Sequence, residues 1–209
     1  MAAAASKAAD RATAREQAVD SDDCRMVAEA VRRAQRGERE AIGLLYARYA
    51  DDVQGYVRSI LRDRHEAEDV TQQVFAKLIT SIGKYEQREV PFFAWMLRVA
   101  RNVALDHIRA RRAVPVGKVR LTETESSGPV GARPVDELRE VLYDLPRDQR
   151  EVLVLRHVAG LSPREIAACT GRTEASIHGL HHRGRRTLQA DLLSRGLAPA
   201  VARTTMRAL

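Results

Sequence analysis

Apolar residues recur at spacings of three and four along most of this chain, which is the periodicity of amphipathic helices. In the first half the pattern predicts four helices, over Cys24–Arg36, Arg39–Leu61, Asp63 to about Ile82, and Pro91–Arg112. Gly37 ends the first helix, and Asp63 with Glu66 forms a capping-box arrangement at the third. Pro91 fits a first helical turn, because its missing N–H costs nothing there. No segment alternates like a strand, so we predict an all-α fold.

The helical pattern breaks between residues 113 and 134, which hold three prolines, three glycines and the run TETESS. We interpret this stretch as a flexible linker. Helices are expected to resume over Val135–Leu145, Arg147–Val158, Arg164–Cys169 and Glu174 to about Leu193. The predicted organisation is therefore a disordered extension (1–22), a helical domain (23–112), the linker (113–134), a second helical domain (135–195) and a tail (196–209).

Composition agrees with this picture. The chain has 209 residues, of which 44% are apolar and only 4% aromatic, a balance that favours helices over a β-sandwich. No apolar run approaches the roughly 20 residues that span a bilayer, and the Ala-rich start is charged throughout, unlike a secretion signal. We therefore expect a cytoplasmic protein without membrane insertion. The sequence has two cysteines, Cys24 and Cys169, with no second cysteine near either, which excludes a disulfide scaffold and a four-cysteine zinc site.

The net charge of +7 is concentrated in two places. Residues 98–120 carry seven Lys and Arg against one acid, and residues 162–209 carry eight Arg against three acids. Two basic patches on an otherwise acidic chain indicate contact with a polyanion, nucleic acid before a membrane surface. The alternative is two solvated arginine-rich helix faces.

Residues 162–193 have the pattern of a helix-turn-helix. Ser162, Pro163 and Glu165 are typical of a helix start, Gly171 of a turn, and Thr173 of a second start. A helix presented in this way fits a major groove about 12 Å wide. Its exposed face would carry Thr173, His178, His182, Arg183 and Arg186. An ordinary helical hairpin with a basic face is the alternative.

The histidines of this segment also raise the question of a metal site. His178 and His182 are four residues apart, and His181 neighbours them. No nearby acid or cysteine completes a coordination shell, so we expect neither a metal site nor a cofactor.

The helix over Pro91–Arg112 carries a second polar face. Its members interleave at spacings of three and four: Trp95, Arg98, Arg101, Asn102, Asp106 and Arg109. Such a face suits stacking on unpaired bases, with arginines on phosphates. The alternative is an amphipathic core helix with Trp95 buried. The preceding helix carries EDVTQQVFAKL at residues 68–78, a face too polar to be core alone.

Together these stretches resemble the sigma-70 family of RNA polymerase sigma factors, in its small two-domain extracytoplasmic-function (ECF) type. AEDVTQQVFAKL is similar to the family's polymerase-binding stretch, and FFAWMLRVARNVALDHIR to its promoter −10 helix. The segment from DLPRDQ to RGRRTL is similar to its −35-binding domain. The resemblance implies a sigma region 2-like domain at 23–112 and a region 4-like domain at 135–195.

The resemblance also implies roles for individual residues. Those that would dock on the β′ clamp helices of core RNA polymerase are Asp69, Gln72, Gln73 and Phe75. Those that would face the melted −10 strand are Trp95, Arg98, Arg101, Asn102, Asp106 and Arg109, together with Lys84 and Tyr85 in the connector Gly83–Glu89 that would capture a flipped base. Those that would read the −35 duplex are Arg172, Thr173, Ser176, His178, His182, Arg183 and Arg186.

The function expected is thus a sigma factor that brings core polymerase to promoter DNA. The β flap is a further implied contact, and an anti-sigma factor a further implied partner. A free-standing helix-turn-helix regulator remains the alternative. A DNA-processing enzyme ranks last, because the sequence has no paired carboxylates with metal spacing, nucleophile constellation or glycine-rich phosphate loop. We therefore expect no enzymatic activity.

Overall fold

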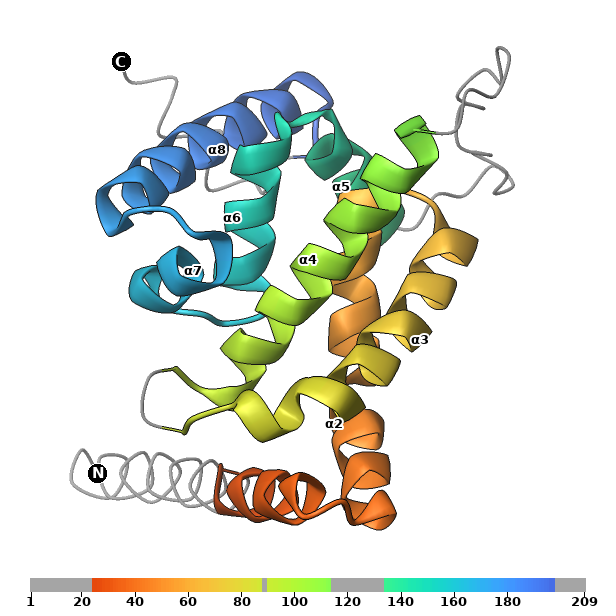
Figure 1. Ribbon diagram of the computed structural model, residues 1–209. Coiled ribbons are helices and arrows are strands. Elements are labelled where there is room, and N and C mark those ends of the chain that lie inside the picture. Colours follow the sequence, from red (N-terminus) through yellow and green to blue (C-terminus); the bar gives the residue numbers. More distant parts are fainter. Residues whose placement is uncertain (1–23, 88–89, 114–133, 198–209) are drawn as a thin grey trace, which may run out of the picture.

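The computed structural model describes residues 24–87, 90–113 and 134–197, and its described secondary structure is entirely helical (Figure 1). An N-terminal helix covers residues 24–35. The remaining elements are α2 (Arg39–Leu61), α3 (Arg64–Ser81), the short 3₁₀ turn η1 (Ile82–Lys84), α4 (Phe92–Ala113), α5 (Pro134–Asp144), α6 (Arg147–His157), α7 (Pro163–Thr170) and α8 (Glu174–Ser194). The predicted all-α fold is confirmed. The predicted extension, nearly all of the linker and most of the tail lie outside the described residues.

Helix ends differ from the prediction by small, explicable amounts. The carbonyl of Pro91 accepts the first hydrogen bond of α4, from Trp95 N at 3.1 Å, so the proline precedes the helix rather than opening it. At α3, Asp63 accepts from Glu66 N at 2.9 Å, as predicted. The Glu66 carboxylate does not complete the capping box, because it pairs with Arg111 of α4 instead.

The N-terminal helix, α2, α3 and α4 form a first group, a bundle around a hydrophobic core. The side chains at its centre are fully or almost fully buried: Leu45, Val53, Val57, Val70, Val74, Leu78, Met96 and Leu97. The second group, α5 to α8, has its own buried side chains, among them Leu145, Leu155, Ile166 and Ile177. Each described helix thus buries one apolar stripe, which is the arrangement that the periodicity predicts.

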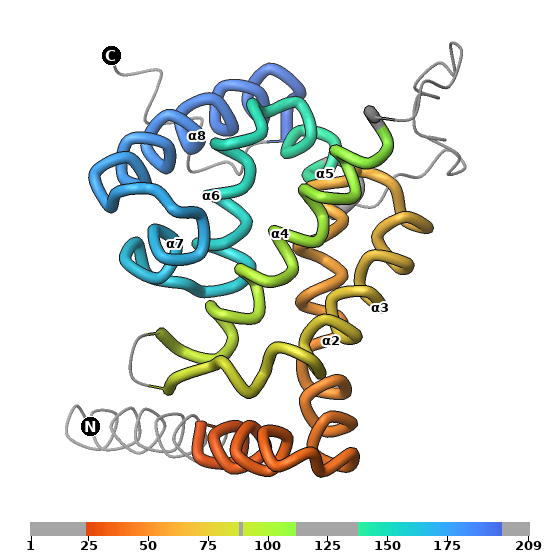
Figure 2. The backbone as a smooth tube through the Cα atoms, in the orientation of Figure 1, coloured from red at the N-terminus to blue at the C-terminus, as the bar shows by residue number. Residues whose placement is uncertain are grey.

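The two groups of helices also pack against each other. Figure 2 shows α4 running between α2 and α3 on one side and α6 and α7 on the other. The contacts run mainly between α4 and α7 and between α2 and α6, and buried residues from both groups form one continuous cluster. None of the described helices combines the length and apolar character needed to cross a membrane.

Candidate nucleic-acid interface

The helix pair α7 and α8 is a helix-turn-helix with the predicted caps. Ser162 Oγ accepts from Glu165 N at 3.3 Å, while the Glu165 carboxylate accepts from Ser162 N at 2.7 Å. Gly171 ends α7 with a φ of 70°, a left-handed conformation that glycine adopts without strain. Thr173 Oγ1 then accepts from Ser176 N at 3.2 Å and opens α8. These local bonds fix the angle at which α8 leaves the turn.

One face of α8 is buried and the opposite face is open. Ile177, Leu180 and Gly184 are buried against the rest of the domain. The candidate residues that are exposed are Thr173, His178, His182, Arg183 and Arg186. Ser176 is partly buried, and Arg172 is tied to α6 by an ion pair of 2.6 Å with Asp148. Five of the seven candidates therefore share a surface that carries two arginines and two histidines.

A histidine pair that the sequence did not indicate lies between α6 and α8. Nε2 of His157 and Nε2 of His181 are 2.9 Å apart, and the two rings stack with centroids 5.2 Å apart. Burial, followed by the nearby His157 and Arg185, lowers the pKa of His181. One Nε2 can donate a hydrogen bond to the other. Among the described residues no three ligating side chains come close enough to hold a metal.

The polar face predicted on α4 divides into exposed and buried members. Arg98, Asn102, Asp106 and Arg109 are exposed, and Asp106 pairs with Arg109 at 2.9 Å. Trp95 is only 7% exposed, which matches the alternative kept open for it from the sequence. Four predicted residues thus form a polar surface, while the tryptophan belongs to the core in this arrangement.

Arg101, the remaining residue of that face, points into the contact between the two helix groups. Its Nε donates to a carboxylate oxygen of Glu151 at 2.8 Å, and Tyr56 donates its hydroxyl to the same oxygen at 2.9 Å. Glu151, on α6, is only 4% exposed. Burial opposes the charge of Arg101, but the attraction of Glu151 outweighs it and raises the pKa of Arg101. Burial and the Glu151 charge raise the pKa of Cys169 to about 12.

No local sequence pattern indicates this buried cluster, which we call the inter-group cluster (Tyr56, Arg101, Glu151 and Cys169). Its members come from α2, α4, α6 and α7. Burial first, and then the Glu151 charge, raises the pKa of Tyr56 well above its usual value. Tyr56, Arg101 and Cys169 are therefore arranged around the Glu151 carboxylate, so the arginine is engaged here rather than open to a ligand.

The connector between α3 and α4 carries the next two candidates. Lys84 is exposed, whereas Tyr85 is 6% exposed and lies against Phe92 and Trp95, with ring centroids 5.3 Å and 5.4 Å away. The Tyr85 hydroxyl donates to the carbonyl oxygen of Val90 at 3.0 Å. The tyrosine therefore anchors the connector to α4. Residues 88 and 89 of the predicted connector lie outside the described residues.

Asp69, Gln72 and Gln73 are all exposed on α3, whereas Phe75 is 5% exposed. The Phe75 ring supports Tyr46 of α2, with centroids 4.7 Å apart. Tyr46 is 47% exposed, and the other large apolar side chains exposed on these two helices are Leu44 and Ile79. Tyr46 has the spacing of the apolar stripe of α2, but its ring covers Phe75 at the surface.

Two family models match this chain. Sigma-70 region 2 matches residues 45–114, and Sigma-70 region 4 matches residues 136–188. The ECF RNA polymerase sigma factor BldN of Streptomyces coelicolor is 34% identical over 185 residues, covering 83% of this chain and 68% of that protein. The ECF RNA polymerase sigma factor SigD of Mycobacterium tuberculosis is 33% identical over 181 residues, covering 82% of this chain and 84% of that protein.

Solved structures agree on the fold. CnrH in complex with the cytosolic domain of CnrY gives a TM-score of 0.60 at 23% identity and covers 79% of this chain and 96% of that one. The sigma factor RpoE of Bartonella quintana, in complex with the anti-sigma factor NepR, gives a TM-score of 0.58 at 22% identity, with coverages of 73% and 96%. A free-standing regulator is not favoured, because both sigma regions match in order. This chain belongs to the sigma-70 family, as an ECF-type sigma factor that directs promoter-specific transcription initiation by RNA polymerase.

Proposed function

We propose that this sigma factor binds core polymerase, the −35 duplex and the −10 strand through three separate exposed helix faces. The α3 face with Asp69, Gln72 and Gln73 docks on the β′ clamp helices of core polymerase. Its exposed carboxylate and amides can make directional hydrogen bonds, and the exposed ring of Tyr46, supported by Phe75, adds apolar contact. Phe75 contributes by holding Tyr46 rather than by touching the polymerase directly.

The α8 face reads the −35 duplex. Arg183, His178 and His182 can donate to base edges, and Arg186 can pair with a phosphate. Ser176 and Arg172 act at the start of the helix, where Arg172 also holds the turn to α6 through Asp148. The second group of helices is expected to dock on the β flap through a surface other than this one.

The α4 face holds the melted −10 strand. Arg98 and Arg109 suit phosphates, Asn102 and Asp106 can bind base edges, and Lys84 stands at the connector that would capture an extruded base. Strand separation is then driven by tighter binding to the open than to the closed promoter. The subunit itself catalyses no reaction in this proposal and works in the cytoplasm.

Promoter binding on this scheme requires the two groups of helices to separate. The centres of elements named −35 and −10 lie about 25 base pairs apart, or about 85 Å of B-form DNA. The 21 residues of α8 span only about 32 Å. Helices α4 and α8 that pack on a shared core cannot reach both elements at once. Separation would also release Arg101 from Glu151 for the −10 strand.

An anti-sigma factor is the expected regulatory partner. The sigma factor RpoE of Bartonella quintana was solved with an anti-sigma factor, which supports this assignment for a chain of the same fold. The proposal as a whole rests on one observation. Each of the two matched sigma regions presents a polar helix face, the first on α4 and the second on α8.

Run-off transcription tests the proposal. Fragmented DNA of the source organism is transcribed by purified core polymerase with and without this protein, and start sites are mapped. We expect new starts that share spaced −35 and −10 elements. If no new starts arise while the same core works with another sigma factor, the proposal fails.

A further inference from the structure

One side chain of the N-terminal helix reaches the turn between α3 and α4. Nε2 of Gln35 donates to the carbonyl oxygen of Ile82 at 3.1 Å and to that of Tyr85 at 2.9 Å. Both acceptors are carbonyl oxygens, so the amide NH₂ must face them, and its two hydrogens serve the two bonds. Gln35 thus ties together the start of η1 and the residue that ends it.

We call residues 82–87 the α3–α4 turn. Tyr85 fixes this turn from the side of α4, through its ring contacts with Phe92 and Trp95 and its bond to Val90. Gln35 fixes the backbone of the same residue through its carbonyl group. The exposed Lys84 lies between the two carbonyls that Gln35 holds. Its backbone is therefore set by two opposed anchors, one of which belongs to the N-terminal helix.

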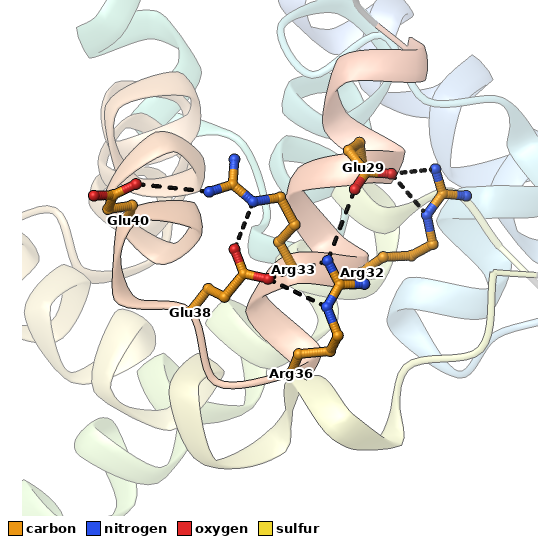
Figure 3. Close-up of polar contacts among 6 residues, drawn as sticks. All are labelled: Glu29, Arg32, Arg33, Arg36, Glu38 and Glu40. Atoms are coloured by element: carbon orange, nitrogen blue, oxygen red, sulfur yellow. Dashed lines mark hydrogen bonds and ion pairs between the residues drawn. The ribbon is translucent and has the colours of Figure 1, made fainter.

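The N-terminal helix that carries Gln35 is itself held against the bundle. Ala30, Val31 and Ala34 bury the N-terminal helix against the bundle. Figure 3 shows a network of ion pairs where this helix meets α2. Arg33 bridges Glu38 at 2.6 Å and Glu40 of α2 at 3.6 Å. These ion pairs hold the helix that carries Gln35 against α2. The α3–α4 turn is therefore held in a defined position relative to the bundle that includes α4.

The N-terminal helix and the turn also face each other across a cleft of about 750 Å³. The residues that line it are Arg25, Met26, Ala28, Glu29, Arg32 and Gln87. All but Gln87 belong to the N-terminal helix. The helix therefore runs alongside the turn beyond the two bonds of Gln35.

We infer that Gln35 is a positioning residue for −10 recognition, which holds the α3–α4 turn in the shape that captures an extruded base. The inference rests on the proposed function, in which Lys84 and its neighbours meet that base. Extruding a base breaks its stacking and pairing, so capture gains from a turn that is already ordered. Without the Gln35 amide the two carbonyls would bond to water, and the turn would sample other shapes.

The test compares variants in reconstituted holoenzyme at a promoter defined by the start-site mapping. Gln35→Glu keeps the size of the side chain but cannot donate to carbonyl groups when ionised. Gln35→Leu removes the donors without adding charge. Gln54→Glu makes the same change of charge at a partly buried glutamine of α2, outside the three proposed contact faces, and serves as the matched control. Templates carry each base change in the −10 element and, separately, in the −35 element.

We expect both Gln35 variants to lose about three- to tenfold of the discrimination between the preferred base and other bases at one −10 position. Discrimination at −35 and affinity for core polymerase should stay at the wild-type level, as they should in Gln54→Glu. Trp95, the single tryptophan, contacts Tyr85, so its emission should shift to the red in both Gln35 variants.

Unchanged −10 discrimination in folded Gln35 variants that bind core polymerase would overturn the inference. A parallel loss at −10 and −35 together with a lower melting temperature would also overturn it, because it would indicate a general structural role. Failure of the wild-type holoenzyme to initiate is a separate result, which removes the proposed function itself.

Discussion

Glu151 joins the two groups of helices through its hydrogen bonds with Tyr56 and Arg101. A buried carboxylate is tolerated only when it is paired and hydrogen-bonded. Here Tyr56 and Arg101 supply both requirements from the other group of helices. The arginine that the family resemblance assigns to the −10 strand is thus occupied while the groups are packed. One carboxylate therefore stabilises this arrangement and occupies the arginine proposed to contact DNA.

Replacing this carboxylate should be costly. We expect Glu151→Ala to lower the free energy of unfolding by about 3 kcal/mol, because it leaves the Tyr56 hydroxyl and the Arg101 guanidinium without their buried partner. Glu68→Ala removes an exposed i,i+4 pair with Arg64 and should cost less than about 0.5 kcal/mol. Urea unfolding of both variants measures the difference. Equal losses would show that the inter-group cluster adds no more than a surface pair.

The two cysteines should differ sharply in reactivity. Cys24 is exposed, whereas Cys169 is buried with its pKa raised to about 12. The reactive thiolate of Cys169 is therefore scarce at pH 8. We expect the native protein to react with an aromatic disulfide reagent at Cys24 at least about 100-fold faster than at Cys169. Comparable rates at the two sites, measured with the Cys24→Ser and Cys169→Ser variants, would contradict the burial of Cys169 in solution.

At the scale of elements, the crossing of α6 and α8 depends on a missing side chain. A Cβ atom at Gly184 would lie 3.2 Å from both Gln149 Cβ and Leu153 Cδ1 of α6. At Gly179, five residues earlier, a Cβ atom would meet only the flexible guanidinium of Arg183, at 3.3 Å. Gly184 is therefore needed for the close approach of α8 to α6, whereas Gly179 is not.

Substituting each glycine tests this difference. Gly184→Ala should destabilise the protein by about 1–3 kcal/mol, since α8 must shift away from α6. Gly179→Ala should be neutral or stabilise by up to about 1 kcal/mol, because alanine favours the helix. Thermal unfolding of the pair provides the measurement. A Gly184→Ala variant as stable as Gly179→Ala would mean that the two helices cross at a greater distance.

These elements also show what a sequence can and cannot predict. The bounds of α2 and the caps Ser162 and Thr173 were predictable, because stripes and caps act within a few residues. The Arg101–Glu151 pair and the Gln35 contacts join residues 47 to 50 positions apart, and no local pattern encodes them. Tyr46 fits an apolar stripe by spacing, but it lies at the edge of the bundle.

At the scale of the whole molecule, the two groups of helices share one core that binding to core polymerase would have to open. We expect the groups of helices to separate in the holoenzyme, which would expose Cys169 and free Arg101. In the Cys24→Ser background, the rate of Cys169 modification should therefore rise at least about tenfold when core polymerase is added in excess. The thiols of core polymerase are blocked beforehand. No change in rate at saturating core would contradict separation.

The continuous core also bears on whether the chain segment between α4 and α5 is needed to keep the two groups of helices together. Because buried residues of α2, α4, α6 and α7 form one cluster, packing holds the two groups of helices together in addition to the segment that joins residues 113 and 134. A chain cut by a specific protease at a site inserted between those residues should still elute as one species on gel filtration. The two fragments, expressed apart and mixed, should likewise recombine, so this sigma factor could be supplied as two polypeptides.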